Sequence, residues 1–222
     1  MTTLLRVDAS IRLHGSVSRA LADSAEAAWR AEHPNGVVVR RDLGRDPLPA
    51  TAWPALAKAQ VGEEPATAAE RDLLTESRAL ATELSEELKN ADAVLLAVPL
   101  YNYGIAQHVK AWIDLLLLDP AYLRGPNPLE GRPVILTLAR GGGYQPGTPK
   151  HGWDHATGYL ERIFGDVFGM QVRIAAAELT LAPVTPGMEE LIDLSKVSET
   201  EALTAAEEHA IVVAKELVGK AA

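Results

Sequence analysis

The chain has 222 residues, of which 47% are hydrophobic, and its formal net charge at pH 7 is −9. This length and hydrophobic content predict one α/β domain, residues 1–222, with a substantial core, and the acidic charge without a basic stripe excludes a nucleic-acid partner. The sequence contains no cysteine, which excludes disulfides, thiolate metal sites and thiol-based redox chemistry.

The amino terminus leads straight into an apolar run, without the basic and apolar regions of a secretory leader. No uninterrupted apolar stretch approaches the length of about 18 residues that a membrane-spanning helix requires. We therefore expect a cytoplasmic protein without membrane insertion.

Apolar runs alternate with helix-forming segments along the chain, which is the pattern of a parallel sheet covered by helices on both faces. The run Ala93–Val98 is apolar at every position, as expected for a central strand buried on both sides. The predicted strands are residues 3–9, 36–41, 92–98, 133–139 and 171–178. The predicted helices are residues 18–32, 67–90, 106–118, 156–169 and 199–219, with a short one at 53–60. Two Pro/Gly-rich segments, 44–66 and 119–132, are predicted to be long surface loops.

A hydroxyl-rich turn, Ser10–Ser18, lies between the first predicted strand and the first predicted helix. Free N–H groups and the helix dipole at such a position favour an anion. The turn has a single glycine, Gly15, unlike the glycine-rich turns of dinucleotide and ATP sites. Its serine hydroxyls suit one terminal phosphomonoester, the kind that flavin mononucleotide (FMN) carries. An ordinary helix N-cap is the alternative explanation.

The loop after the third predicted strand contains two tyrosines, Tyr101 and Tyr103, on either side of Asn102. In an open parallel sheet, ligands bind outside the carboxyl ends of the strands, where this loop lies. The tyrosines can offer a wall to a planar ring, and the backbone between them can pair with the polar edge of the ring. Alternatively, both tyrosines pack onto the helix that follows.

The loop after the fourth predicted strand contains three consecutive glycines, Gly141–Gly143, which are conformationally costly in a simple connection. Exposed amide groups there can stabilise negative charge on a reduced ring. Tyr144, His151 and His155 follow and can donate a hydrogen bond or a proton, although a histidine in a Pro/Gly loop is commonly just solvated. The six histidines show no ligand spacing with carboxylates, and no metal site is expected.

Together the three loops resemble the FMN-dependent NADH-azoreductases, a family of flavodoxin-like quinone reductases. The resemblance extends to Trp29, Arg41–Leu43 and Val109–Asp114 and so covers nearly the whole chain. It implies a five-stranded parallel sheet of order 2-1-3-4-5 with helices on both faces. It also implies a homodimer with two sites at its interface, to which residues 44–66 contribute. The cofactor-binding residues that it implies are Ser10, Ser16, Val17 and Ser18 at the FMN phosphate, Leu100, Tyr101, Asn102 and Tyr103, with Pro99 before them, along the isoalloxazine ring, and Ala139, Arg140, Gly141 and Gly142 at its pyrimidine edge.

The resemblance further implies a ping-pong transfer of two electrons from NADH or NADPH, through FMN, to a quinone, azo or nitroaromatic acceptor. The chain departs from the family at Ala139, where the family commonly has serine, and at Leu115–Leu118, which lead into a segment without the family's Gly-x-Thr-Phe. We therefore expect a remodelled acceptor pocket. Tyr144 and His151 resemble instead a tyrosine and a histidine that assist charge redistribution in mammalian-type quinone reductases, and we take them as candidate catalytic residues.

Two other functions remain open from the sequence. One is a flavodoxin-like electron carrier or regulatory module, and the other is a specialised biosynthetic flavoenzyme that acts on one aromatic intermediate. The four consecutive leucines and the missing segment favour the second of these.

Overall fold

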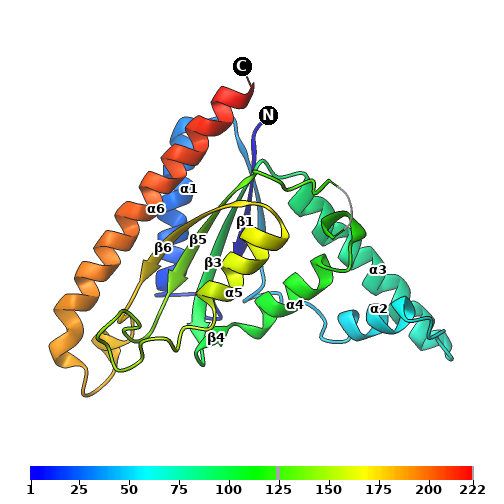
Figure 1. The fold of residues 1–222 in the computed structure, drawn as a ribbon, viewed down its shortest axis with the longest axis horizontal. Coiled ribbons are helices and arrows are strands. Elements are labelled where there is room, and N and C mark those ends of the chain that lie inside the picture. Colours follow the sequence, from blue (N-terminus) through cyan, green and yellow to red (C-terminus); the bar gives the residue numbers. More distant parts are fainter. Residues whose placement is uncertain (124–125, 222) are drawn as a thin grey trace.

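The structure is a computed structural model that describes residues 1–123 and 126–221. Its centre is a parallel sheet with the order β2-β1-β3-β5-β6 (Figure 1). The strands are β1 (Thr3–Asp8), β2 (Val37–Asp42), β3 (Ala93–Tyr101), β5 (Pro133–Ala139) and β6 (Gln171–Ala177). These are the five predicted strands in the predicted order 2-1-3-4-5, which is thereby confirmed.

Helices cover both faces of the sheet (Figure 1). The helices are α1 (Val17–Glu32), α2 (Ala52–Gln60), α3 (Ala68–Lys89), α4 (Gln107–Leu116), α5 (Thr157–Glu161) and α6 (Ile192–Ala221). Successive residues of a strand point to opposite faces: in β3, Leu95 packs with α1 and α6, whereas Leu96 packs with α3 and α4. Both faces of the central strands are therefore buried, as their apolar sequences predict.

Three boundaries differ from the sequence prediction. Strand β3 continues to Tyr101, because it pairs antiparallel with a two-residue strand, β4 (Gly104–Ile105). The helix predicted at 156–169 changes from α5 to a π-helical segment at Arg162–Val167. Helix α6 begins at Ile192 instead of residue 199, directly after a 3-10 turn at Glu189–Leu191. Ser198, within the added turns of α6, accepts a hydrogen bond from the backbone N–H of Glu178 at 2.9 Å.

The predicted surface segment 44–66 contains α2, whose bounds agree with the short helix predicted at 53–60. Helix α2 packs against α3, and the two project beyond the sheet (Figure 1). The second segment, 119–132, begins with a 3-10 turn at Pro120–Tyr122, and residues 124 and 125 of this segment lie outside the described residues. Among the residues that the structure describes, no helix combines the length and the apolar character needed to cross a bilayer.

Candidate functional site

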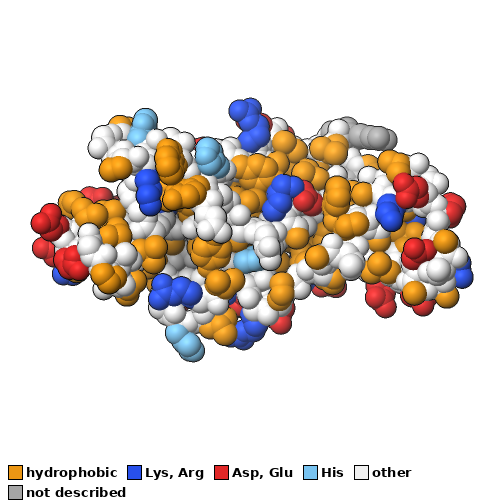
Figure 2. Space-filling view, turned by 90° about the horizontal axis from the view of Figure 1, so that it is seen from below, with side chains coloured by type: hydrophobic (Ala, Val, Ile, Leu, Met, Phe, Trp, Pro, Cys, Tyr) orange, Lys and Arg blue, Asp and Glu red, His pale blue; other side chains and the backbone are white. Residues whose placement is uncertain are grey.

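The three loops identified in the sequence lie along one edge of the sheet, because the carboxyl ends of parallel strands meet at the same edge. Figure 2 views the molecule from this side. Hydrophobic side chains and several histidines occupy the middle of the view, whereas acidic side chains gather mainly at its two ends.

The serine turn places hydroxyls and free N–H groups at the start of α1. Ser10 and Ser18 are 2% and 0% exposed, and the Oγ atoms of Ser16 and Ser18 are 3.4 Å apart. Ser16 is the N-cap of α1, but it accepts from the backbone N–H of Arg19 only at 3.5 Å. The N–H groups of Val17 and Ser18 donate to no described residue. The cap is therefore present but weak, and it leaves donors available for an anion.

A partly buried ion-pair cluster, Asp8, Arg19 and Asp42, lies directly beside this turn. The guanidinium of Arg19 lies 2.7 Å from Asp42 and 3.7 Å from Asp8, and it also donates to the carbonyl of Ser10 at 2.7 Å. Burial would raise the pKa of Asp42, but hydrogen bonds from the Arg19 side chain and the Arg45 backbone, together with the charges of both arginines, hold that pKa below its ordinary value. Sequence reasoning missed this cluster; its available signal was an aspartate at the end of each of two neighbouring strands, Asp8 beside Asp42.

The tyrosine loop is a tight hairpin in an unusual conformation. Its two central residues, Asn102 and Tyr103, have φ values of +48° and +66°. Two positive φ values are typical of the type I′ hairpin turn, which asparagine tolerates but a tyrosine rarely adopts. Tyr103 is 39% exposed, and its ring meets the edge of Trp153 at a centroid distance of 5.3 Å. Tyr103 is therefore held at the surface instead of packing into the core.

Hydrogen bonds join this hairpin to both neighbouring loops. The hydroxyl of Tyr101 accepts from the backbone N–H of Ile11, in the serine turn, at 3.3 Å. The carbonyl of Tyr103 accepts from the backbone N–H of His155, in the loop after β5, at 2.9 Å. The structure thus brings the three predicted loops together, with the hairpin in the middle.

The glycine loop presents a row of unpaired donors. Residues Leu179–Leu181, which follow β6, donate their backbone N–H groups to the carbonyls of Arg140, Gly141 and Gly142 at 3.0–3.3 Å. By contrast, the N–H groups of Gly141–Gly143 donate to no described residue. Adjacent backbone donors of this kind suit the electron-rich edge of a ligand.

Not every glycine of this loop is explained by a ligand. A Cβ atom on Gly141 would lie 2.6 Å from Cδ1 of Leu181, so any larger residue there requires the half-exposed end of the Leu181 side chain to shift. A Cβ atom on Gly142 would make only ordinary contacts, the nearest 3.6 Å away on Lys150. Gly142 is therefore the position where an open approach to the backbone is the better reason for glycine.

The side chain of Arg140, directly before the three glycines, forms ion pairs and a hydrogen bond within the protein. Its guanidinium pairs with Glu178 at 2.9 Å and with Asp154 at 2.8 Å, and it donates to the hydroxyl of Thr157 at 2.8 Å. Burial would raise the pKa of Asp154, but hydrogen bonds from Thr157 and the charge of Arg140 hold the pKa below its ordinary value. The side chain of Arg140 is thus a structural group, and only its backbone borders the loop surface.

The two candidate catalytic residues differ in their surroundings. Tyr144 is half-buried, and burial, followed by repulsion from Tyr103, Asp154 and Glu178, raises the pKa of its phenol. His151 is exposed. Neither side chain forms a hydrogen bond with another described residue, and the structure does not join the two. No cluster of three or more potential metal ligands was found among the described residues.

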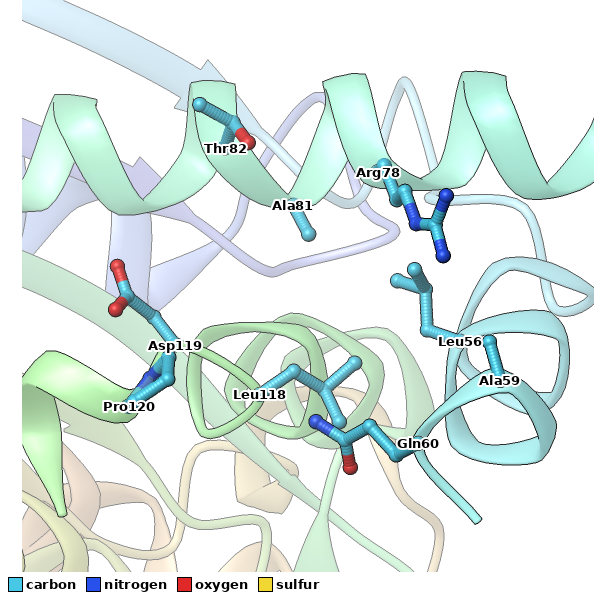
Figure 3. A pocket seen from close by; sticks show the side chains of 9 residues that line it. All are labelled: Leu56, Ala59, Gln60, Arg78, Ala81, Thr82, Leu118, Asp119 and Pro120. Atoms are coloured by element: carbon cyan, nitrogen blue, oxygen red, sulfur yellow. The ribbon is translucent and has the colours of Figure 1, made fainter. Parts of the chain in front are cut away.

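A hollow of about 740 Å³ lies beside the hairpin. His108 is among the lining residues that the sequence did not indicate. The ring of His108 is buried, and its Nε2 lies 2.5 Å from the carbonyl of Ala9 at the end of β1. A second hollow, of about 480 Å³, lies between α2, α3 and Leu118–Pro120, with Arg78 and Gln60 among its lining residues (Figure 3). It includes no residue of the three predicted loops.

The leucine run has a structural explanation. Leu115 and Leu116 are fully buried in the core. Tyr122, which follows the run, packs on Phe168 at a centroid distance of 5.1 Å, and its hydroxyl lies 2.8 Å from Ser85 Oγ. Leu115, Leu116 and Tyr122 therefore belong to the core, whereas Leu118 lines the second hollow (Figure 3).

Comparison with known proteins agrees with this geometry. Residues 2–188 match a family described as having a flavodoxin-like fold. An FMN-dependent NADH:quinone oxidoreductase of Frankia casuarinae is 36% identical over 209 residues, which cover 93% of this chain and 97% of that protein. A protein of the same name from Frankia alni is 39% identical over 197 residues, covering 87% and 92%. An azoreductase from Bacillus anthracis has a TM-score of 0.73 at 25% identity, covering 95% of this chain and 99% of the other.

Proposed function

Because the chain belongs to the flavodoxin-like family of FMN-dependent NADH:quinone oxidoreductases, we propose that it transfers two electrons from NADH to a quinone or azo acceptor, with FMN as cofactor. The observation that carries this proposal is the pair of unpaired N–H arrays, one at Val17 and Ser18 and one at Gly141–Gly143. They lie on the two sides of the tyrosine hairpin, and they suit a ligand with a phosphate at one end and a polar ring edge at the other.

The residues of the site fit FMN. The phosphate would bind at Ser10 and Ser16–Ser18, where hydroxyls and the amino end of α1 supply donors. The ring would lie along Pro99–Tyr103, with its polar edge at residues 139–142. Ala139 supplies no hydroxyl there, so recognition at that edge depends on the backbone N–H groups of the glycines.

FMN supplies the electron-transfer chemistry when it is bound, and the protein binds, orients and shields it. The raised pKa of Tyr144 keeps its phenol protonated at neutral pH, so it would act as a hydrogen-bond donor toward an acceptor. We assign His151 a second donor role, with a smaller contribution than that of Tyr144 because its side chain is exposed to solvent. NADPH as donor and nitroaromatic compounds as acceptors stay predictions.

We further propose a cytoplasmic homodimer that buries the site edge. Large apolar side chains are exposed around the hairpin: Ile11 is 63% exposed, Leu13 48% and Trp153 50%. A cluster of such side chains beside a candidate site is a common mark of an interface. The segment 44–66 exposes Trp53 and would contribute to the same contact. Residues 1–222 would act as one domain in each protomer, because α6, near the end of the chain, packs against α1 on the same face of the sheet.

The decisive experiment is a spectroscopic one. The purified protein should bind FMN and be yellow, NADH should bleach it under anaerobic conditions, and a quinone or azo compound should restore the colour. A protein that binds no FMN would contradict the proposal. Tight FMN binding without bleaching by NADH would favour the electron-carrier module instead.

A further inference from the structure

A short strap of chain holds the glycine loop in place. Beyond β6, residues Glu178–Leu181 run beside the loop, and the N–H groups of Leu179–Leu181 donate to three successive carbonyls of the loop. Leu179 has a φ of +58°, a left-handed conformation that is uncommon for leucine. A non-glycine residue stays in this conformation only where its surroundings force it. The strap is therefore a specific structure and not a loose connection.

Within this strap, Glu178 contacts both ends of the glycine loop. One carboxylate oxygen, Oε1, accepts from the guanidinium of Arg140 at 2.9 Å, directly before the three glycines. The other, Oε2, accepts from the backbone N–H of Tyr144 at 3.0 Å, directly after them. The amide of Gln145 also donates to Oε1, at 3.3 Å. One side chain thus bridges residues 140 and 144 across the three glycines.

The bridge is buried and anchored. Glu178 is 8% exposed, and its backbone N–H donates to Ser198 of α6 at 2.9 Å. Glycine loses more backbone freedom on ordering than any other residue, so ordering three glycines in a row costs conformational entropy that ligand binding would otherwise have to offset. A bridge between their two ends imposes this ordering before binding, and a preorganised site binds its ligand more tightly.

We propose that Glu178 is a positioning residue for the flavin, which bridges the ends of the glycine loop and fixes the N–H groups of Gly141–Gly143 toward the polar edge of the ring. This inference rests on the proposed FMN function. Glu178 does not itself touch the ligand in this assignment; it acts through the backbone of the loop.

The test compares Glu178→Ala and Glu178→Gln with the wild-type protein. The FMN dissociation constant of the apoprotein is measured by fluorescence quenching. We expect Glu178→Ala to raise it by about tenfold, the size of one net hydrogen bond. Glu178→Gln should recover most of this loss, because its amide oxygen can still accept from the N–H of Tyr144. Hydrogen exchange in the apoprotein should show lost protection at Leu179–Leu181 in Glu178→Ala.

The matched control is Glu26→Ala. Glu26 is also buried and paired with arginines, Arg6 at 3.1 Å and Arg30 at 2.8 Å, but it lies on α1 away from the loop. Its loss should lower the melting temperature and change the FMN dissociation constant by less than about twofold. If Glu178→Ala does not fold, Glu178→Gln carries the test, with an expected rise of about threefold because the ion pair with Arg140 is lost.

Two results would separate this inference from the proposed function. Wild-type protein that fails to bind FMN would refute the function itself. Wild-type protein that binds FMN, together with foldable Glu178 variants of unchanged affinity and unchanged protection at Leu179–Leu181, would refute the positioning role alone.

Discussion

Arg19 and Arg140 lie near the two candidate ends of the ligand, yet neither guanidinium is free to bind it. Arg19 is held by Asp42, and Arg140 by Glu178 and Asp154. The recognition of an anion or an electron-rich edge therefore depends on hydroxyls and backbone N–H groups. Such neutral donors are fixed in place and avoid the desolvation penalty that a buried charge carries.

The two glycines beside Arg140 lead to opposite expectations. Gly141→Ala should destabilise the apoprotein by up to about 1 kcal/mol, because the half-exposed end of the Leu181 side chain must shift to make room for the new methyl group. Gly142→Ala should leave stability nearly unchanged but weaken FMN binding, because its methyl group would lie on the open side of the backbone. Urea denaturation and FMN titration of both variants check this, and equal stability losses would contradict it.

Tyr144 permits a second prediction at the residue scale. Because burial and nearby negative groups raise the pKa of its phenol, its ionisation should not limit activity at or below about pH 10. Tyr144→Phe should lower the rate of quinone reduction by about tenfold, the size of one hydrogen bond, without changing the shape of the neutral pH profile. His151→Ala should have a smaller effect. Unchanged turnover in both variants would remove both residues from the mechanism.

Among the elements, α1 raises the question whether its serines cap the helix or bind a phosphate. The 3.5 Å cap bond of Ser16 is long, so Ser16→Ala should cost only about 0.5 kcal/mol of stability. If the turn binds phosphate, Ser16→Ala and Ser18→Ala should weaken FMN binding while leaving the affinity for riboflavin, which lacks the phosphate, unchanged. Isothermal titration with both ligands measures this difference.

The control for this prediction is the N-cap of α3. Thr67 forms a complete capping box with Glu70, so Thr67→Ala should cost about 1 kcal/mol of stability and leave FMN affinity unchanged. If the serine variants lose affinity for FMN and riboflavin equally, the turn has a structural role and does not bind the phosphate.

Helices and strands were predicted best where the residues within the element itself determine its conformation. The apolar runs of β3 and β5 and the capping box of α3 are local signals, and these elements lie where the sequence places them. The hairpin after β3 depends instead on partners elsewhere in the fold. Tyr103 adopts a positive φ while its carbonyl accepts from the N–H of His155 and its ring contacts Trp153.

At the scale of the whole molecule, carboxylates that are paired in the folded state should make the free energy of unfolding depend on pH in the acidic range. Glu26, Asp42, Asp119 and Asp154 have pKa values below their ordinary ones, because hydrogen bonds and ion pairs outweigh burial. A lowered folded-state pKa contributes stability above the unfolded-state pKa, and this contribution is lost as the pH falls through the folded-state value. The free energy of unfolding should therefore fall between about pH 5 and pH 2.

A pair of variants tests this assignment. Asp42→Asn should lower the free energy of unfolding at neutral pH. It should also make the decrease of that free energy between about pH 5 and pH 2 less steep. Asp193→Asn, which changes an exposed side chain, should change neither. If Asp42→Asn leaves the pH dependence of the free energy of unfolding unchanged, this assignment is wrong.

The proposed homodimer gives a further prediction for the whole molecule. Sedimentation equilibrium should give twice the chain mass of 23.7 kDa. Trp153→Asp should shift the protein toward the monomer, because it places a charge in the exposed apolar cluster, whereas Val184→Asp, at another exposed apolar side chain, should not. A monomeric wild-type protein would refute the dimer.

The sequence by itself determined the alternation of strands and helices, and with it the sheet order that its family resemblance implied. It also located the three loops at the strand ends, because the carboxyl ends of parallel strands must share one edge. The serines, tyrosines and glycines of these loops indicated a phosphate-bearing aromatic cofactor through local chemistry alone.

Only the tertiary structure decided which groups remain available to a ligand. The carbonyls of Arg140–Gly142 are paired by a segment near residue 180, and Glu178 bridges residues 140 and 144 from the end of another strand. The side chain that a Cβ atom at position 141 would meet first is Leu181, which is forty residues further along the chain. Such contacts leave no local pattern in the sequence, because they exist only when distant segments are packed side by side.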